Sequence, residues 1–194
     1  RSTLFPYTTL FRSLNNIKIE IRSTFSKKPG TKITDEINVI SKKAITGISY
    51  TKDIAKITVI GVKDKPGVAS EMFKPLKEIN LDMIVQSSSA DKGETDITFT
   101  IKREDIKKAI NLLKKNKKIS YEKIIQNDKV SKVSVVGAGM ITQPGVAQKF
   151  FNALAKERIN IMVISTSEIK ISVLIDQKHT NEAVKALHKE FDLE

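Results

Sequence analysis

The sequence reads Lys56-Ile-Thr-Val-Ile-Gly61 and, a few residues later, Pro66-Gly-Val-Ala69. The first motif returns with conservative changes as Lys132-Val-Ser-Val-Val-Gly137, and the second returns letter for letter as Pro144-Gly-Val-Ala147. The first pair is offset by 76 residues and the second by 78, so the second copy has two extra residues in its loop. An internal repeat of this kind decides the architecture of the chain.

Each copy continues with the same order of predicted elements. Alternating apolar residues, Ile57 and Val59 in the first copy and Val133 and Val135 in the second, predict a strand. After the Pro-Gly loop, apolar residues at helical spacing predict a helix, which Pro75 should kink in the first copy. The spacing is that of Val68, Met72, Leu76 and Ile79 in the first copy and of Val146, Phe150 and Leu154 in the second. Two strands and a second helix follow, over residues 81–87, 96–102 and 104–116 in the first copy and 161–167, 170–176 and 180–191 in the second.

The two copies differ in their last strand. The first copy ends with a predicted strand over residues 121–126, which completes a β-α-β-β-α-β unit. The second copy has only residues 192–194 left after its last helix, whereas a spare strand, residues 44–50, precedes the first copy. We therefore predict that the spare strand crosses over and completes the second sheet. The fold class is α+β, with two ferredoxin-like β-α-β-β-α-β modules whose antiparallel sheets carry helices on one face. The predicted domains are residues 52–128, and residues 44–51 together with 129–194.

The composition restricts the chemistry. The 194 residues suffice for two small domains, and the absence of Cys excludes disulfides and thiolate chemistry. His179 and His188, nine residues apart, lack the spacing of a helical metal pair, so we expect neither a metal site nor a catalytic residue. The net charge of +12 comes mostly from dispersed lysines and accompanies only 6% aromatic residues, which favours a solvated lysine-rich surface over a nucleic-acid site. No apolar run reaches the roughly 20 residues of a membrane span, so we expect a cytoplasmic protein without a membrane partner.

The first thirteen residues differ from the rest of the chain. Residues 1–13 contain Thr-Leu-Phe twice and neither lysine nor acidic residues. We interpret them as a non-native leader and exclude them from the fold.

With these residues in place, the chain resembles the regulatory region of aspartokinase, a tandem pair of ACT domains. The matching segments are Ala44-Ile-Thr-Gly-Ile48, Val62-Lys-Asp-Lys-Pro-Gly67, Asp82-Met-Ile-Val-Gln86, Thr95-Asp-Ile-Thr-Phe99, Lys132-Val-Ser-Val-Val-Gly-Ala-Gly-Met140 and Ser165-Thr-Ser-Glu-Ile-Lys-Ile-Ser-Val-Leu-Ile175. Residues 17–33 look like the tail of the family's kinase domain, so we interpret 14–43 as a remnant of that tail with a linker.

The resemblance implies an activity that this chain is not expected to carry out alone. The family's enzyme phosphorylates the side-chain carboxylate of aspartate with ATP, the first step toward lysine, threonine and methionine. The kinase domain and its signature are missing from the sequence, and so is a Walker-type phosphate loop. We therefore expect no catalysis and no cofactor here, because ATP and Mg would bind the missing domain. The chain is interpreted as a gene fragment or as a separately made regulatory subunit.

A first effector site follows from the family's motif and from the chemistry of a free amino acid. The start of a helix offers unpaired amides to a carboxylate, and an acidic side chain just before it can bind the ammonium. From spacing alone, the segment Asp64-Lys-Pro-Gly67 is better explained as a simple turn before a helix, and it is the family resemblance that favours an effector site. By resemblance, the pocket consists of Asp64, Gly67, Val68, Ala69 and Gln86, closed by Asn160 and Ile161 of a second module.

A second, weaker effector site is implied at the equivalent place in the second copy. There Thr142 stands where Asp64 stands in the first copy, so the carboxylate is missing. By resemblance, this site would use Thr142, Gly145, Val146, Ala147, Ser167 and Glu168, with Ser88 from the other module. Thr98 reads as a residue on the solvent face of a strand, and the family implies a role in coupling rather than in contact with the effector.

Three functions compete at this point. The first is a regulatory module that binds threonine, lysine or both, forms a homodimer through its ACT domains and inhibits an attached aspartate kinase domain or subunit. The second is an RNA-binding protein, since RNA-recognition domains share the β-α-β-β-α-β order, although the strand Asp96-Ile-Thr-Phe-Thr-Ile101 lacks the paired aromatic residues that stack on bases. The third is an active aspartate kinase. We favour the first, without a nucleic-acid partner.

Overall fold

The structure is a computed structural model that describes residues 19–22, 24–25, 30–33, 44–89 and 93–193. These residues fall in two units, 1–40 and 41–194. In the first unit, β1 (Ile19–Ile21) pairs antiparallel with β2 (Thr31–Ile33). The predicted leader, residues 1–13, and most of the predicted linker lie outside the described residues.

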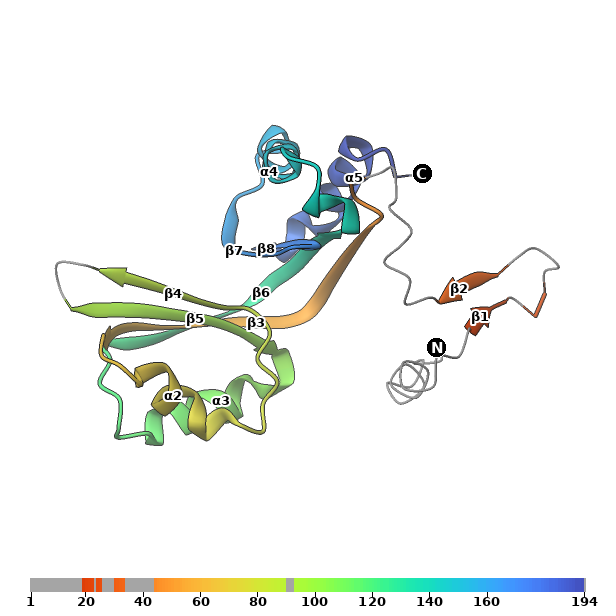
Figure 1. Cartoon of the computed structure of the whole chain (residues 1–194). Coiled ribbons are helices and arrows are strands. Elements are labelled where there is room, and N and C mark those ends of the chain that lie inside the picture. The colour runs from red at the N-terminus through yellow and green to blue at the C-terminus, as the bar shows by residue number, and fades with distance from the viewer. Residues whose placement is uncertain (1–18, 23, 26–29, 34–43, 90–92, 194) are drawn as a thin grey trace. The chain divides into compact units, whose positions relative to one another are not determined.

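The second unit contains a six-stranded antiparallel sheet with the order β4-β5-β3-β6-β8-β7 (Figure 1). Its strands are β3 (Gly47–Lys63), β4 (Ile84–Ser89), β5 (Glu94–Lys102), β6 (Lys123–Val136), β7 (Ile161–Ser167) and β8 (Lys170–Asp176). The α-helices are α2 (Val68–Phe73), α3 (Ile106–Lys115), α4 (Val146–Lys156) and α5 (Thr180–Glu190), with short 3-10 turns η1 (Lys74–Leu76), η2 (Arg103–Asp105), η3 (Ala138–Ile141) and η4 (Gln177–His179). Figure 1 shows α2 and α3 on one side of the sheet and α4 and α5 on the other. The predicted α+β class with two ferredoxin-like modules is confirmed.

Two long strands run through both modules. Residues 56–60 of β3 pair with residues 123–127 of β6, whereas residues 47–51 of β3 pair with residues 132–136 of β6. The segment before the first repeat therefore forms a strand beside the second repeat. The sequence predicted separate strands here, because polar residues interrupt the apolar alternation. In the structure the backbone pairing continues past the interruption, with register shifts between Thr51 and Lys56.

We call β4, β5, α2 and α3, with the adjoining halves of β3 and β6, the first module, and β7, β8, α4 and α5, with the other halves, the second module. The domain boundaries predicted at residues 51/52 and 128/129 fall inside the two long strands and stay a prediction.

Each module has its own hydrophobic core. In the first, Ile57 and Val59 of β3 and Phe99 of β5 are fully buried beneath α2 and α3. In the second, Val133 and Val135 of β6 lie in a cluster with residues of α4 and α5. The alternating apolar residues of both repeats thus face their own helices, as the period of a strand requires.

The structure corrects several predicted boundaries. The first helix ends at Phe73 and continues only as the 3-10 turn η1, because Pro75 lacks an amide and its ring crowds the preceding turn. The strand predicted to start at residue 81 starts at Ile84. The helix predicted to start at residue 104 starts at Ile106, after η2.

In the second module, the Asp176 carboxylate accepts a hydrogen bond from the Lys178 amide at 3.0 Å, and this bond lowers the pKa of Asp176.

Candidate effector site

A pocket of about 380 Å³ lies between the loop that precedes α2 and strand β4 of the first module. Five of the residues predicted for the first effector site line it together: Asp64, Gly67, Val68, Ala69 and Gln86. The loop residues Lys65 and Pro66 complete the lining. The pocket therefore places an acidic side chain, a helix start and a side-chain amide around one small volume.

Asp64 is positioned from two directions. Its amide donates a hydrogen bond to the Gly93 carbonyl at 2.9 Å. Its carboxylate accepts a hydrogen bond from the Ser88 hydroxyl at 3.1 Å. The Asp64 side chain is exposed, so the carboxylate keeps acceptor capacity for a ligand ammonium.

Gly67 sets the direction of the helix start. Its φ of 88° lies in the left-handed region, which glycine adopts without the strain that a Cβ causes. The Val68 amide already donates to the Lys65 carbonyl at 3.1 Å. The first amides of a helix have no intrahelical partner, so the Ala69 amide, together with that of Gly67, is available on this side of the pocket to a carboxylate.

Asn160 and Ile161 do not line this pocket within the chain. Asn160 is exposed, and Ile161 at the start of β7 packs against the core of the second module. Their predicted role in closing the pocket from a second module stays a prediction.

At the second predicted site the backbone before the helix has the same conformation as at the first, but the surrounding side chains differ. Gly145, before α4, has a φ of 86°, and Val146 and Ala147 follow it as Val68 and Ala69 follow Gly67. The Thr142 hydroxyl lies 3.4 Å from the Gly139 carbonyl, so this side chain is held by its own loop.

The other residues assigned to the second site are spread over both modules. Ser167 ends β7 and Glu168 follows in the turn, and both are exposed. Ser88 lies on β4 of the first module, where it contacts Asp64. Its assignment to the second site stays a prediction.

Thr98 is not a simple solvent-facing residue. Its hydroxyl forms a 2.9 Å hydrogen bond with the Thr58 hydroxyl across β3 and β5, and the pair is partly buried. Val85 of β4 is its register partner on the other side. The alternation with Ile97 and Phe99 correctly indicated that Thr98 lies on the opposite face of β5 from these two residues. The sequence did not show that side chains of the neighbouring strands partly bury Thr98.

Sequence reasoning missed an acidic pocket of about 260 Å³ next to Asp64. Its acidic side chains come from two segments, Glu94 and Asp96 from β5 and Glu122 from just before β6, and Ser88 connects it to Asp64. The Asp96 carboxylate already accepts a hydrogen bond from the Gly61 amide at 3.0 Å, so one of its oxygens has a partner within the protein. Only the fold brings Glu122 beside the two acids of β5, so the sequence carried no signal for this cluster.

The described residues show none of three features that other functions would need: a metal-binding cluster, a membrane-spanning helix and an exposed Phe99. They contain no group of three or more His, Cys, Asp or Glu residues able to hold a metal ion. No helix in the described part of the chain is long and apolar enough to cross a membrane. Phe99 is fully buried beneath the helices, so it is not available to stack on an RNA base.

The family model described as "ACT domain" matches residues 57–116 and 133–191. The chain is 44% identical over 184 residues to an aspartokinase of Corynebacterium glutamicum, a match that covers 92% of this chain and 44% of the relative. It is 43% identical over 188 residues to an aspartate kinase of Pseudomonas putida, covering 95% of this chain and 46% of the relative. The chain thus spans less than half the length of these relatives.

Two solved structures are similar over nearly their whole length. A chain of the aspartokinase alpha and beta subunits is 46% identical, with a TM-score of 0.71, and the match covers 77% of this chain and 99% of that one. The ligand-free regulatory subunit of aspartate kinase from Thermus thermophilus is 36% identical, with a TM-score of 0.71 and the same coverage. Neither these nor the other comparisons support an RNA-binding function.

Proposed function

This chain belongs to the aspartokinase family, as its regulatory pair of ACT domains, and on that premise we propose that it binds threonine, lysine or both as feedback effectors of aspartate kinase. The observation that supports the proposal most directly is the pocket of about 380 Å³ that Asp64, Ala69 and Gln86 line together. These residues come from a loop, from α2 and from β4, and they offer groups for both charges of a free amino acid.

The proposed contacts follow from the chemistry of a zwitterion. The Asp64 carboxylate binds the ammonium, and the Ala69 amide binds the carboxylate at the helix start. The Gln86 side chain can donate and accept, so it can bind either end of the ligand. The Gly67 backbone leaves this side of the pocket open, since a Cβ there would meet no atom within 4 Å.

Regulation requires that the effector bind one state of the enzyme more tightly than the other. We propose that a second copy of the chain supplies Asn160 and Ile161 to close the pocket, so that effector binding is coupled to the arrangement of a homodimer. Aspartate kinase activity itself, with its ATP and Mg, is assigned to a catalytic domain or subunit with which this chain acts.

The proposal is tested by thermal unfolding with threonine, with lysine, with both and with neither. A ligand that binds only the folded state stabilises it by RT ln(1 + [L]/Kd), about 2.7 kcal/mol at a hundredfold excess over Kd. We expect a saturable rise in melting temperature with at least one of the two amino acids. No rise with either, alone or together, would contradict the proposal.

Asp64→Asn tests the pocket itself, because it removes the charge and keeps the shape. We expect at least a tenfold weaker binding of the effector, measured by calorimetry. Asp105→Asn is the matched control, since Asp105 directly precedes α3 without a side-chain capping bond and does not line the pocket. Equal binding by the Asp64 variant and the wild type would place the effector elsewhere.

A further inference from the structure

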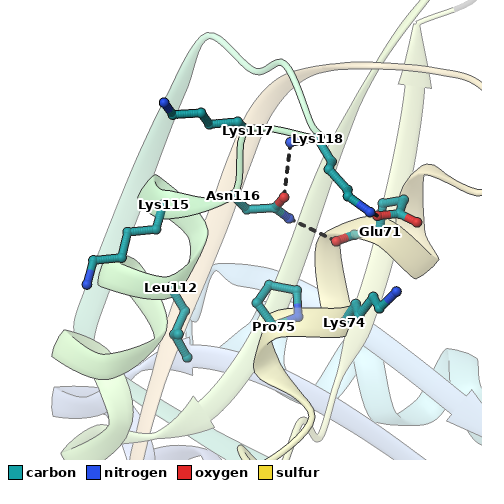
Figure 2. A pocket seen from close by; sticks show the side chains of 8 residues that line it. All are labelled: Glu71, Lys74, Pro75, Leu112, Lys115, Asn116, Lys117 and Lys118. Carbon is teal, nitrogen blue, oxygen red and sulfur yellow. Dashed lines mark hydrogen bonds and ion pairs between the residues drawn. The ribbon is translucent and has the colours of Figure 1, made fainter.

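A second pocket of the first module, of about 430 Å³, lies between the α2–η1 segment and the end of α3 (Figure 2). Half of the residues that line it are lysines: Lys74, Lys115, Lys117 and Lys118, together with Glu71, Pro75, Leu112 and Asn116. It shares no lining residue with the pocket of Asp64. We call it the lysine pocket.

The backbone that carries the lysines is fixed. The Asn116 side-chain amide donates to the Glu71 carbonyl at 2.9 Å, and its oxygen accepts the Lys118 amide at 3.1 Å. Figure 2 shows the first bond joining the end of α3 to α2 and the second closing the turn that follows α3. The segment that presents the lysines is thus held in place before any ligand arrives, which lowers the entropic cost of binding.

The charges of the pocket are only partly compensated. The Lys118 ammonium lies 3.5 Å from the Glu71 carboxylate. Within the described residues, Lys74, Lys115 and Lys117 form no ion pair with an acidic side chain. Figure 2 shows Lys115 and Lys117 on one side of Pro75 and Lys74 on the other. Lysines without an acidic partner therefore flank the apolar residues Pro75 and Leu112 on two sides.

The second module provides an internal comparison. Ala109 and Leu113 of α3 correspond to Ala183 and Leu187 of α5, and all four are fully buried. The last residues of α3 and the three that follow are Lys114-Lys-Asn-Lys-Lys118, whereas the equivalent residues at the end of α5 are His188-Lys-Glu-Phe-Asp192. The same fold therefore ends the same helix without a lysine cluster, so neither packing nor the helix dipole requires it. The lysines of the first module call for a different explanation.

We propose that the lysine pocket binds a small ligand that carries two or more phosphate groups. Its volume lies within the range of about 300–1,000 Å³ that is usual for small-molecule sites. Lysine ammonium groups are common phosphate ligands in proteins, and three uncompensated ones suit a multivalent anion better than a single carboxylate. The apolar floor can also contact an organic part of the ligand.

The observations favour a small anion over a polymer. The lysines gather around one pocket instead of following a stripe along the sheet, and no aromatic side chain lines the pocket. Single-stranded RNA binding usually combines a basic groove with stacking aromatics. An acidic peptide would need an extended groove or a sheet edge, whereas this site is a local depression between two helical segments.

The test is calorimetric titration of the chain with inorganic tripolyphosphate, with ATP in the absence of magnesium, and with AMP. Lys115→Gln/Lys117→Gln removes two charges from the pocket. Lys185→Gln/Lys189→Gln removes two charges from α5, where both lysines are exposed, and serves as the matched control. We expect saturable one-to-one binding of tripolyphosphate, weakened at least tenfold by the pocket variant and less than twofold by the control.

The ligands separate the two sources of such an anion. Tighter binding of ATP than of tripolyphosphate identifies a nucleotide as the ligand class, and equal binding identifies the polyphosphate group alone. In either case AMP should bind at least tenfold more weakly. The proposal is overturned if the polyphosphates show no saturable binding, or if the two double variants weaken that binding equally. Oligouridylate and polyglutamate are titrated as an RNA and an acidic polymer, and tighter binding of either one than of both polyphosphates would also overturn it. Threonine and lysine binding, measured on the same variants, reports on the effector site separately.

Discussion

At the scale of single residues, glycine is favoured at some positions by the backbone conformation and at others by the lack of space for a Cβ. Gly67 and Gly145 have φ values of 88° and 86°, so their backbone conformation favours glycine although no atom lies near the missing Cβ. Gly137 is extended, a conformation open to any residue. There the space is closed, because a Cβ would lie 2.1 Å from the Ala44 carbonyl oxygen and 2.7 Å from the Ile45 Cα.

The first prediction is that Gly137→Ala destabilises the fold by displacing the segment that crosses over to the second module. The obstructing atoms belong to the backbone, which yields less easily than a side chain, and overpacking of this kind costs about 1–3 kcal/mol. We expect a lower midpoint in urea unfolding. Gly47→Ala is the control, since a Cβ at Gly47 meets nothing within 4 Å. If both variants unfold at the same midpoint, the close approach at Gly137 is absent.

At the scale of elements, the two long strands bulge where the modules meet. The register between β3 and β6 shifts between Thr51 and Lys56, so carbonyls near the shift lose their partners in the ladder. Arg103 takes two of them, since its Nη2 donates to the carbonyls of Lys52 and Asp128, both at 2.8 Å. The same nitrogen donates to the Gln177 side chain at 3.0 Å. Arg103 and Gln177 begin η2 and η4, the equivalent turns of the two modules.

The second prediction is that Arg103→Met lowers the free energy of unfolding by about 1–3 kcal/mol, since it leaves these acceptors without their charged donor. Arg103→Lys should recover part of the loss, because it keeps a charge but not the planar group of donors. The measurement is urea unfolding followed by circular dichroism. Lys107→Met, a change at an exposed residue of α3, is the control for the lost charge. Equal stability of the Arg103 and Lys107 methionine variants would contradict a bracing role.

The junction also marks the limit of what the sequence could predict. The repeat, the order of elements and the buried faces follow from local periodicity, as Ile57, Val59, Val133 and Val135 illustrate. The residues of the first pocket from Asp64 to Ala69 are contiguous, so a motif could identify them. The joining of strands at Thr51, the partners of Arg103 and the meeting of Glu94 with Glu122 depend on pairings between distant segments, which no local pattern records.

At the scale of the whole second unit, the modules share more than two strands. A small hydrophobic cluster contains Ile54 and Val130 from the long strands, Met83 from the first module, and Val163 and Leu174 from the second. The two end strands of the sheet, β4 and β7, adjoin this cluster through Val85 and Met162. Burial of these side chains links the stability of one module to that of the other.

The last prediction follows from this shared core: residues 41–194 unfold as one cooperative unit. Ile97→Val removes one methyl group from the core of the first module, where Ile97 is 1% exposed, and such a change costs about 0.5–1.5 kcal/mol. If unfolding is cooperative, the most protected amides of β8 in the second module lose the same free energy as those of β5. At a loss of about 1 kcal/mol, their hydrogen exchange becomes roughly fivefold faster. Val173→Ala, in the core of the second module, should accelerate exchange in β5 in the same way. Faster exchange confined to β5, α2 and α3 in the Ile97 variant would show instead that each module opens alone. In that case, effector binding at Asp64 would not change the stability of the second module through the shared strands.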